Sequence, residues 1–158
     1  MSEEPTTSST STLPITASRT DQVRLGFGIS IFGLAIFILG AKPEWVGLDR
    51  SPVIGFVQIS VFTLGLGLLC LGGYIGLAGL WKNEERSILA DIGARLIGTG
   101  YVIAVFAGMA DIFGMGTQPL PDVPFFGPWQ AIGVQAAQMV IIAGMIMMIP
   151  FHRYKKQS

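Results

Sequence analysis

Long apolar runs alternate with short polar connections along the chain. Four runs contain few charged residues, and they cover residues 25–41, 53–81, 88–110 and 129–151. The hydrocarbon core of a bilayer is about 30 Å thick, and an α-helix that rises about 1.5 Å per residue crosses it with about 20 apolar residues. The pattern therefore predicts an all-α membrane protein, in which four transmembrane helices form an antiparallel bundle over residues 23–151.

Polar segments flank this transmembrane domain. Residues 1–22 are rich in serine and threonine and contain few large apolar side chains. Such a tail cannot bury enough surface to offset the entropy of ordering, so we expect it to be disordered unless a partner holds it. Residues 152–158 form a short basic tail. In the polar connection before the third run, Asn83 is a candidate N-cap for the third helix.

The composition indicates that lipid is the solvent around these helices. Charged residues make up 13% of the chain, hydrophobic residues make up 51%, and the mean hydropathy is +0.60. A soluble domain usually has about 25% charged residues. Ten basic residues balance ten acidic residues, so no net charge attracts nucleic acid. Cys70 is the only cysteine, which excludes an intramolecular disulfide and a multi-cysteine metal site within one chain.

The distribution of basic residues predicts the orientation of the chain. With four spans, both termini and the connection at residues 82–87 share one side of the membrane. That side carries seven basic residues and the opposite side carries two, and such a bias is typical of cytoplasmic segments. We therefore expect both termini on the cytoplasmic side, with Trp81 at that interface and Trp129 at the opposite one. The seven residues are Arg19, Arg24, Lys82, Arg86, Arg153, Lys155 and Lys156, and the two are Lys42 and Arg50.

Glycines recur at regular spacing in the second and third runs. In lipid, helices associate through close backbone approach over small residues, because no hydrophobic force drives them together. We interpret the two stripes as surfaces that pack the second and third helices together within the chain, as the tightest pair of the bundle. The alternative is that a stripe also contacts another subunit. The glycines are Gly65, Gly72, Gly76 and Gly79 in the second run and Gly93 and Gly100 in the third.

Polar residues within the third run form a second pattern. Asp91 and Arg95 are four residues apart, so they share one face of a helix. Charges inside a membrane indicate an ion or proton step by default, but Arg95 can also pair with Asp91 and extend toward the interface. We favour the pair. Asp111 closes the far end of this run, either as a solvated helix end or as a partner for Arg50.

Two glutamines share one face of the fourth run, Gln135 and Gln138. An amide in lipid needs a hydrogen-bonding partner, so this face should contact protein or water. Helix packing is the simpler interpretation, and the lining of a polar pathway is the alternative.

No motif in the sequence assigns a cofactor or a catalytic step. Methionines in the fourth run could ligate copper, but they form no repeated motif and are interpreted as apolar packing. His152, the only histidine, could ligate a haem, but its basic neighbours favour an interfacial position. Walker A, GxGxxG, HExxH and GxSxG patterns are absent from the sequence. The chain is therefore not expected to be an enzyme. The methionines are Met139, Met145, Met147 and Met148.

These patterns favour a structural function. We expect a non-catalytic accessory or assembly subunit of a larger membrane complex, such as a respiratory or photosynthetic one, that packs through its glycine-rich helix faces. Its partners would be the bilayer and either other membrane subunits or further copies of the chain. The alternative is a homo-oligomeric channel or small transporter that uses Asp91, Arg95, Gln135 and Gln138.

Overall fold

The chain is folded as four helices that run alternately up and down. The structure, a computed structural model, describes residues 18–42, 47, 56–82, 85–115 and 127–151. Each helix in this part is long and apolar enough to cross a membrane, which identifies a multi-pass membrane protein and confirms the predicted fold class. The helices are α1 (Arg19–Ala41), α2 (Phe56–Leu80), α3 (Ile88–Gly108) and α4 (Pro128–Met147).

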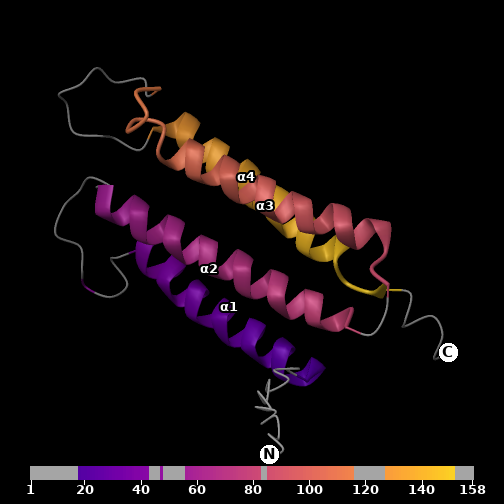
Figure 1. The fold of residues 1–158 in the computed structure, drawn as a ribbon. Helices are drawn as coiled ribbons and strands as arrows, with labels where there is room; N and C mark the ends of the chain where they lie inside the picture. The colour runs from indigo at the N-terminus through magenta and orange to yellow at the C-terminus, as the bar shows by residue number, and fades with distance from the viewer. Residues whose placement is uncertain (1–17, 43–46, 48–55, 83–84, 116–126, 152–158) are drawn as a thin grey trace, which may run out of the picture.

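The ends of the helices define two ends of the bundle (Figure 1). The near end holds the start of α1, the end of α2, the start of α3 and the end of α4. The far end holds the opposite termini of the same helices. Large apolar side chains are exposed along all four helices, as lipid-facing surfaces require.

Three helix ends show how local interactions set the boundaries of the helices. α1 begins at Arg19, ahead of the first apolar residue, because Asp21 Oδ2 accepts a hydrogen bond from the backbone nitrogen of Ser18 at 3.2 Å and stabilises the polar first turn. α3 is capped by Ser87, which accepts from the nitrogen of Ala90, and not by the predicted Asn83, which lies outside the described residues. α4 ends at Met147, because the downstream Pro150 disfavours helical backbone in the residue before it.

α1 and α2 pack through their backbones. A Cβ atom at Gly33 would lie 2.5 Å from the backbone nitrogen of Leu69, and one at Gly26 or Gly40 would also collide with the backbone of α2. Each step of seven residues forward along α1 moves this contact seven residues backward along α2, from Gly76 to Leu69 to Phe62. The three α1 glycines therefore form a continuous antiparallel seam.

The predicted α2 stripe belongs to the same seam. A Cβ atom at Gly72 would lie 2.5 Å from the backbone nitrogen of Ser30, and one at Gly65 would collide with the backbone of Phe37. The prediction that this stripe packs α2 against α3 is therefore wrong. The reason is that α1 carries its own glycines at the same seven-residue period, so its surface fits that of α2. The four glycines of the stripe are Gly65, Gly72, Gly76 and Gly79, and each faces α1.

The predicted α3 stripe packs against α4. A Cβ atom at Gly93 would lie 2.5 Å from the carbonyl oxygen of Gly144, and one at Gly100 would lie 3.0 Å from the carbonyl oxygen of Ala137. The expectation that α2 and α3 form the tightest pair is therefore also wrong. The bundle consists of two tight hairpins, α1–α2 and α3–α4.

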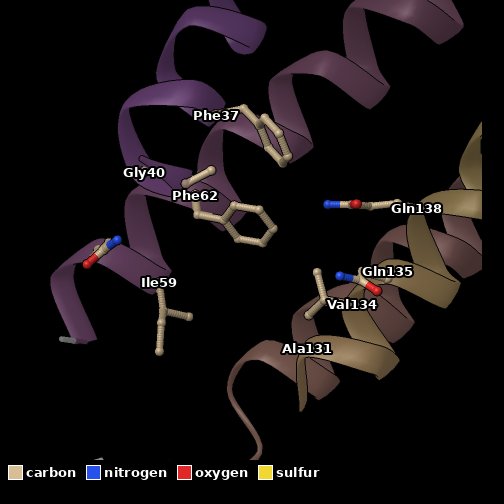
Figure 2. Close-up of a pocket in the computed structure, with 10 residues that line it drawn as sticks. Phe37, Gly40, Ile59, Phe62, Ala131, Val134, Gln135 and Gln138 are labelled. Atoms are coloured by element: carbon tan, nitrogen blue, oxygen red, sulfur yellow. The ribbon is translucent and has the colours of Figure 1, made fainter. Parts of the chain in front are cut away.

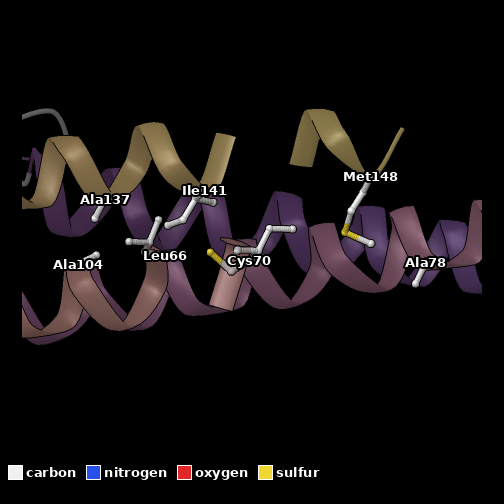
Figure 3. Close-up of a cluster of buried hydrophobic side chains, with 8 residues drawn as sticks. Leu66, Cys70, Ala78, Ala104, Ala137, Ile141 and Met148 are labelled. Carbon is white, nitrogen blue, oxygen red and sulfur yellow. The ribbon is translucent and has the colours of Figure 1, made fainter. Parts of the chain in front are cut away.

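Side chains, and not backbones, join the two hairpins. Over Gly67 of α2 lies the hydroxyl group of Tyr101, and over Gly73 lies the end of the Met145 side chain. A cluster of buried side chains from α2, α3, α4 and the residue after α4 fills the space between them (Figure 3). Its members are Leu66, Cys70, Ala78, Ile97, Ala104, Ala137, Ile141 and Met148.

Trp81 ties the hairpins together at the near end. Its side chain is only 4% exposed, and its Nε1 donates a hydrogen bond to the carbonyl oxygen of Met148 at 2.7 Å. This bond satisfies a carbonyl at the end of α4 that has no partner further along the helix. Trp81 was expected to face the membrane interface, but protein covers it. Trp129, at the far end, is 75% exposed and free to contact an interface.

The glycine seam generates a stability prediction. We expect Gly33→Ala to lower the free energy of unfolding by about 1–3 kcal/mol, because the added methyl group meets the backbone of α2. The matched control is Gly28→Ala on the same helix, where a Cβ atom meets nothing within 4 Å. The measurement is equilibrium unfolding of the purified protein in mixed micelles. Equal stabilities for the two variants would contradict the seam.

The Trp81 hydrogen bond generates a second prediction. We expect Trp81→Phe to destabilise the protein by about 1–3 kcal/mol, because a buried carbonyl loses its partner while the aromatic volume is nearly kept. Trp129→Phe is the control, since that side chain lies at the surface. Thermal unfolding in detergent would compare them, and a Trp81→Phe variant as stable as the wild type would rule out this role.

Candidate functional site

A groove lies between the two hairpins in the far half of the bundle. Its volume is about 280 Å³. Small residues border it on both sides, Gly40 and Ala41 from α1 and Ala131 from α4, so none of the described side chains fills this space as Trp81 and Met148 do at the near end. The ten lining residues are Phe37, Gly40, Ala41, Gln58, Ile59, Phe62, Ala131, Val134, Gln135 and Gln138.

Amide groups form one side of the groove. Figure 2 shows the Gln138 side chain reaching from α4 toward Phe62, with the Gln135 amide beside Val134 on the same helix. A third lining amide, that of Gln58 in the first turn of α2, belongs to the opposite hairpin. Within the described residues, no hydrogen bond joins these three amides to another protein group. Their donors and acceptors are therefore available to a bound molecule.

Aromatic rings form the opposite side. Phe37 of α1 and Phe62 of α2 lie with their ring centroids 4.8 Å apart and their planes tilted by 39° (Figure 2). The pair is held in place by the α1–α2 seam, because Gly40 packs directly on the backbone of Phe62. Ile59 and Val134 complete the apolar lining. The groove thus places a ring pair opposite amide groups, between surfaces fixed by separate hairpins.

The second candidate surface is the outward face of α3, formed by Asp91, Arg95, Gly98 and Thr99, all exposed. The predicted ion pair is confirmed, with Arg95 Nη2 3.4 Å from Asp91 Oδ2. The two side chains are 82% and 57% exposed, respectively. A Cβ atom at Gly98 would meet nothing within 4 Å. This face lies opposite the buried face of α3 that packs on α4.

The four polar residues of the channel hypothesis do not meet within one chain. Gln135 and Gln138 line the groove in the far half of the bundle. Asp91 and Arg95 lie in the first two turns of α3, at the near end, and point away from the protein. The structure thus gives two separate polar surfaces.

Asp111 joins neither polar surface. It is half-buried in the turn after α3, where its backbone carbonyl accepts from the nitrogen of Gly114 at 3.2 Å. Its proposed partner Arg50 lies outside the described residues, so that pairing stays a prediction.

Sequence reasoning missed two kinds of functional residue. The α1 glycines repeat every seven residues, as those of α2 do, so the signal was present and was not used. Phe37 and Phe62 gave no signal, because an apolar side chain that lines a groove reads in the sequence like one that faces lipid.

The candidate metal ligands of the sequence lie partly inside and partly outside the described residues. Among the described residues, no group of three or more histidine, cysteine, aspartate or glutamate side chains could hold a metal ion. Met145 and Met148 pack in or against the buried cluster, in agreement with their interpretation as apolar packing, whereas Met139 is exposed. His152 lies outside the described residues.

Comparison of the chain with protein-family models, with curated proteins and with solved structures finds no match. The two surfaces are therefore interpreted from their own residues.

Proposed function

We propose that the protein is a non-catalytic accessory or assembly subunit of a larger membrane complex, and that it contacts this complex through the outward face of α3. The observation that carries the proposal is the exposed Asp91–Arg95 pair with Gly98 and Thr99 beside it. On α3 this ionised pair is followed within one turn by an exposed glycine and an exposed threonine.

The position of these residues along α3 supports a protein contact. At about 1.5 Å per residue, Arg95 lies about 10 Å from the start of α3 at Ile88, and Gly98 lies about 15 Å from it, near the middle of a span. A glycine at that depth gains nothing from lipid, whereas it allows another helix to approach closely. A charged side chain within a span is costly in hydrocarbon and is stabilised by polar groups of a neighbouring helix.

The glycine stripes no longer support an intersubunit contact. Those of α2 and α3 are covered by α1 and α4 inside the hairpins, so they stabilise the subunit itself. The outward face of α3 replaces them as the proposed docking surface. A homo-oligomeric channel is the less supported alternative, because its four polar residues are divided between the two ends of the bundle.

We also propose that both termini are cytoplasmic. The support is the excess of basic residues in the terminal segments and in the connection between α2 and α3. Ser18, Arg86 and the end of α4 all lie at the near end of the bundle. All three therefore face the same side of the membrane.

The docking proposal predicts a specific loss of association. We expect the wild-type protein, extracted in mild detergent, to migrate on native gels with a complex larger than the chain or its dimer. Gly98→Leu and Arg95→Leu should each release the protein from that complex, because they block close approach or remove the charge. Gly28→Leu is the control, since Gly28 is also an exposed glycine on which a Cβ atom meets nothing within 4 Å, but it lies on α1.

Three outcomes would contradict the proposal. The first is migration of the wild type only as a monomer or a small homo-oligomer, and the second is complex formation by the Gly98→Leu and Arg95→Leu variants. The third is release by Gly28→Leu to the same extent, because the loss would then not be specific to α3.

The orientation proposal predicts opposite labelling at the two ends. In a Cys70→Ala background, S18C should react with a membrane-impermeant maleimide only after the cytoplasmic side is opened. M115C should react in intact cells, because it lies at the other end and is exposed. The reverse pattern would show that the termini face outward.

A further inference from the structure

We infer that the groove between the hairpins binds one uncharged amphiphile from the lipid phase, whose flat ring carries carbonyl groups, the chemistry of a quinone head group. This inference goes beyond the proposed docking function and does not depend on it, because the groove and the outward face of α3 share no residue. Four properties of the groove support this inference. They are its aromatic and amide sides, the absence of ionised residues from its described lining, the depth of its amides in the membrane, and its opening to lipid.

The two sides of the groove fit the face and the edge of such a ring. Phe37 and Phe62 offer aromatic surface, on which a flat conjugated ring packs in offset or tilted geometry. Gln138 reaches toward these rings from across the groove, and Gln135 lines the same side as Gln138 (Figure 2). Their amide N–H groups can donate to carbonyl oxygens at the edge of the ring, and these donors have no protein partner among the described residues.

The uncharged lining of the groove favours an uncharged head group. None of the ten described lining residues is ionised. A phosphate group or a carboxylate would be desolvated there without a cation to compensate it, which is costly in a medium of low dielectric constant. An uncharged carbonyl needs only a hydrogen-bond donor, and the glutamines supply it.

The depth of the amides distinguishes a ring from a lipid head group. Along α4, Gln135 lies about 10 Å and Gln138 about 15 Å from Pro128, at about 1.5 Å per residue. These positions are inside the hydrocarbon of a core about 30 Å thick, below the level of phospholipid head groups. A molecule with oxygens at this depth must be soluble in hydrocarbon as a whole.

The groove is accessible from the bilayer. Gln135 and Ala41 are both lining residues and exposed, so the space reaches the lipid-facing surface. Its volume of about 280 Å³ is close to the lower limit of about 300 Å³ for small-molecule pockets. One ring fits in such a space, and an attached hydrocarbon tail would extend into the lipid.

The test is equilibrium binding of radiolabelled decyl-benzoquinone to the full-length protein in nanodiscs of zwitterionic lipid, with empty nanodiscs subtracted. We expect saturable binding of one molecule per chain. Ala131→Leu should weaken it about tenfold or more, because the larger side chain fills the groove. Ala136→Leu is the matched control, an exposed alanine of the same helix outside the groove.

A second variant separates hydrogen bonding from shape. The double substitution Gln135→Leu and Gln138→Leu should weaken binding about tenfold, because two donors are lost while the apolar volume remains. Circular dichroism and thermal unfolding would verify that each variant is folded. A decyl-benzene without oxygens should compete poorly with the probe for the wild type.

The inference is overturned by any of three results. One is the absence of saturable binding to the wild type. Another is unchanged binding by the folded Ala131→Leu and double-glutamine variants. The last is equal competition by monoacylglycerol, which would assign the groove to a flexible neutral lipid and not to a flat ring. None of these results affects the docking of α3, which the native gels measure separately.

Discussion

Backbone contact across glycine is the interaction on which the rest of this structure depends. In hydrocarbon, lipid tails are as apolar as leucine side chains, so helices gain little by burying large apolar groups against each other. They gain instead from dense van der Waals contact and from the close approach that only a missing side chain allows. The α1–α2 and α3–α4 seams provide this contact, and a Cβ atom at most seam glycines would meet the backbone of the opposite helix.

Because the seam glycines face inward within each hairpin, side chains and not backbones occupy the space between the two hairpins. There, Tyr101 and Met145 insert their side chains over single glycines of α2, and the backbones stay further apart. At the near end Trp81 and Met148 fill the remaining volume and share a hydrogen bond. At the far end small residues border the space, and it remains as a groove. The proposed ligand site is thus a consequence of how the two hairpins meet.

The polar residues illustrate how far sequence reasoning reached toward the candidate sites. The pairing of Asp91 with Arg95 could be predicted, because it is local and follows from helical spacing alone. The expectation that Gln135 and Gln138 contact protein or water stays a prediction, and the structure places both in the lining of a groove. Their relation to Phe37 and Phe62 could not be predicted, because it joins helices that are distant in the sequence and belong to different hairpins.

The sequence by itself determined the number of spans and the residues available for close helix packing. Both properties are local, since hydrophobic length follows from consecutive residues and a stripe follows from the helical repeat. Only the tertiary structure decided which helices share a seam. A stripe of small residues on one helix fits any other such stripe, so α2 alone could not specify α1 over α3. Which helices pair depends on how all four helices are aligned against one another. The same alignment determines where the groove lies.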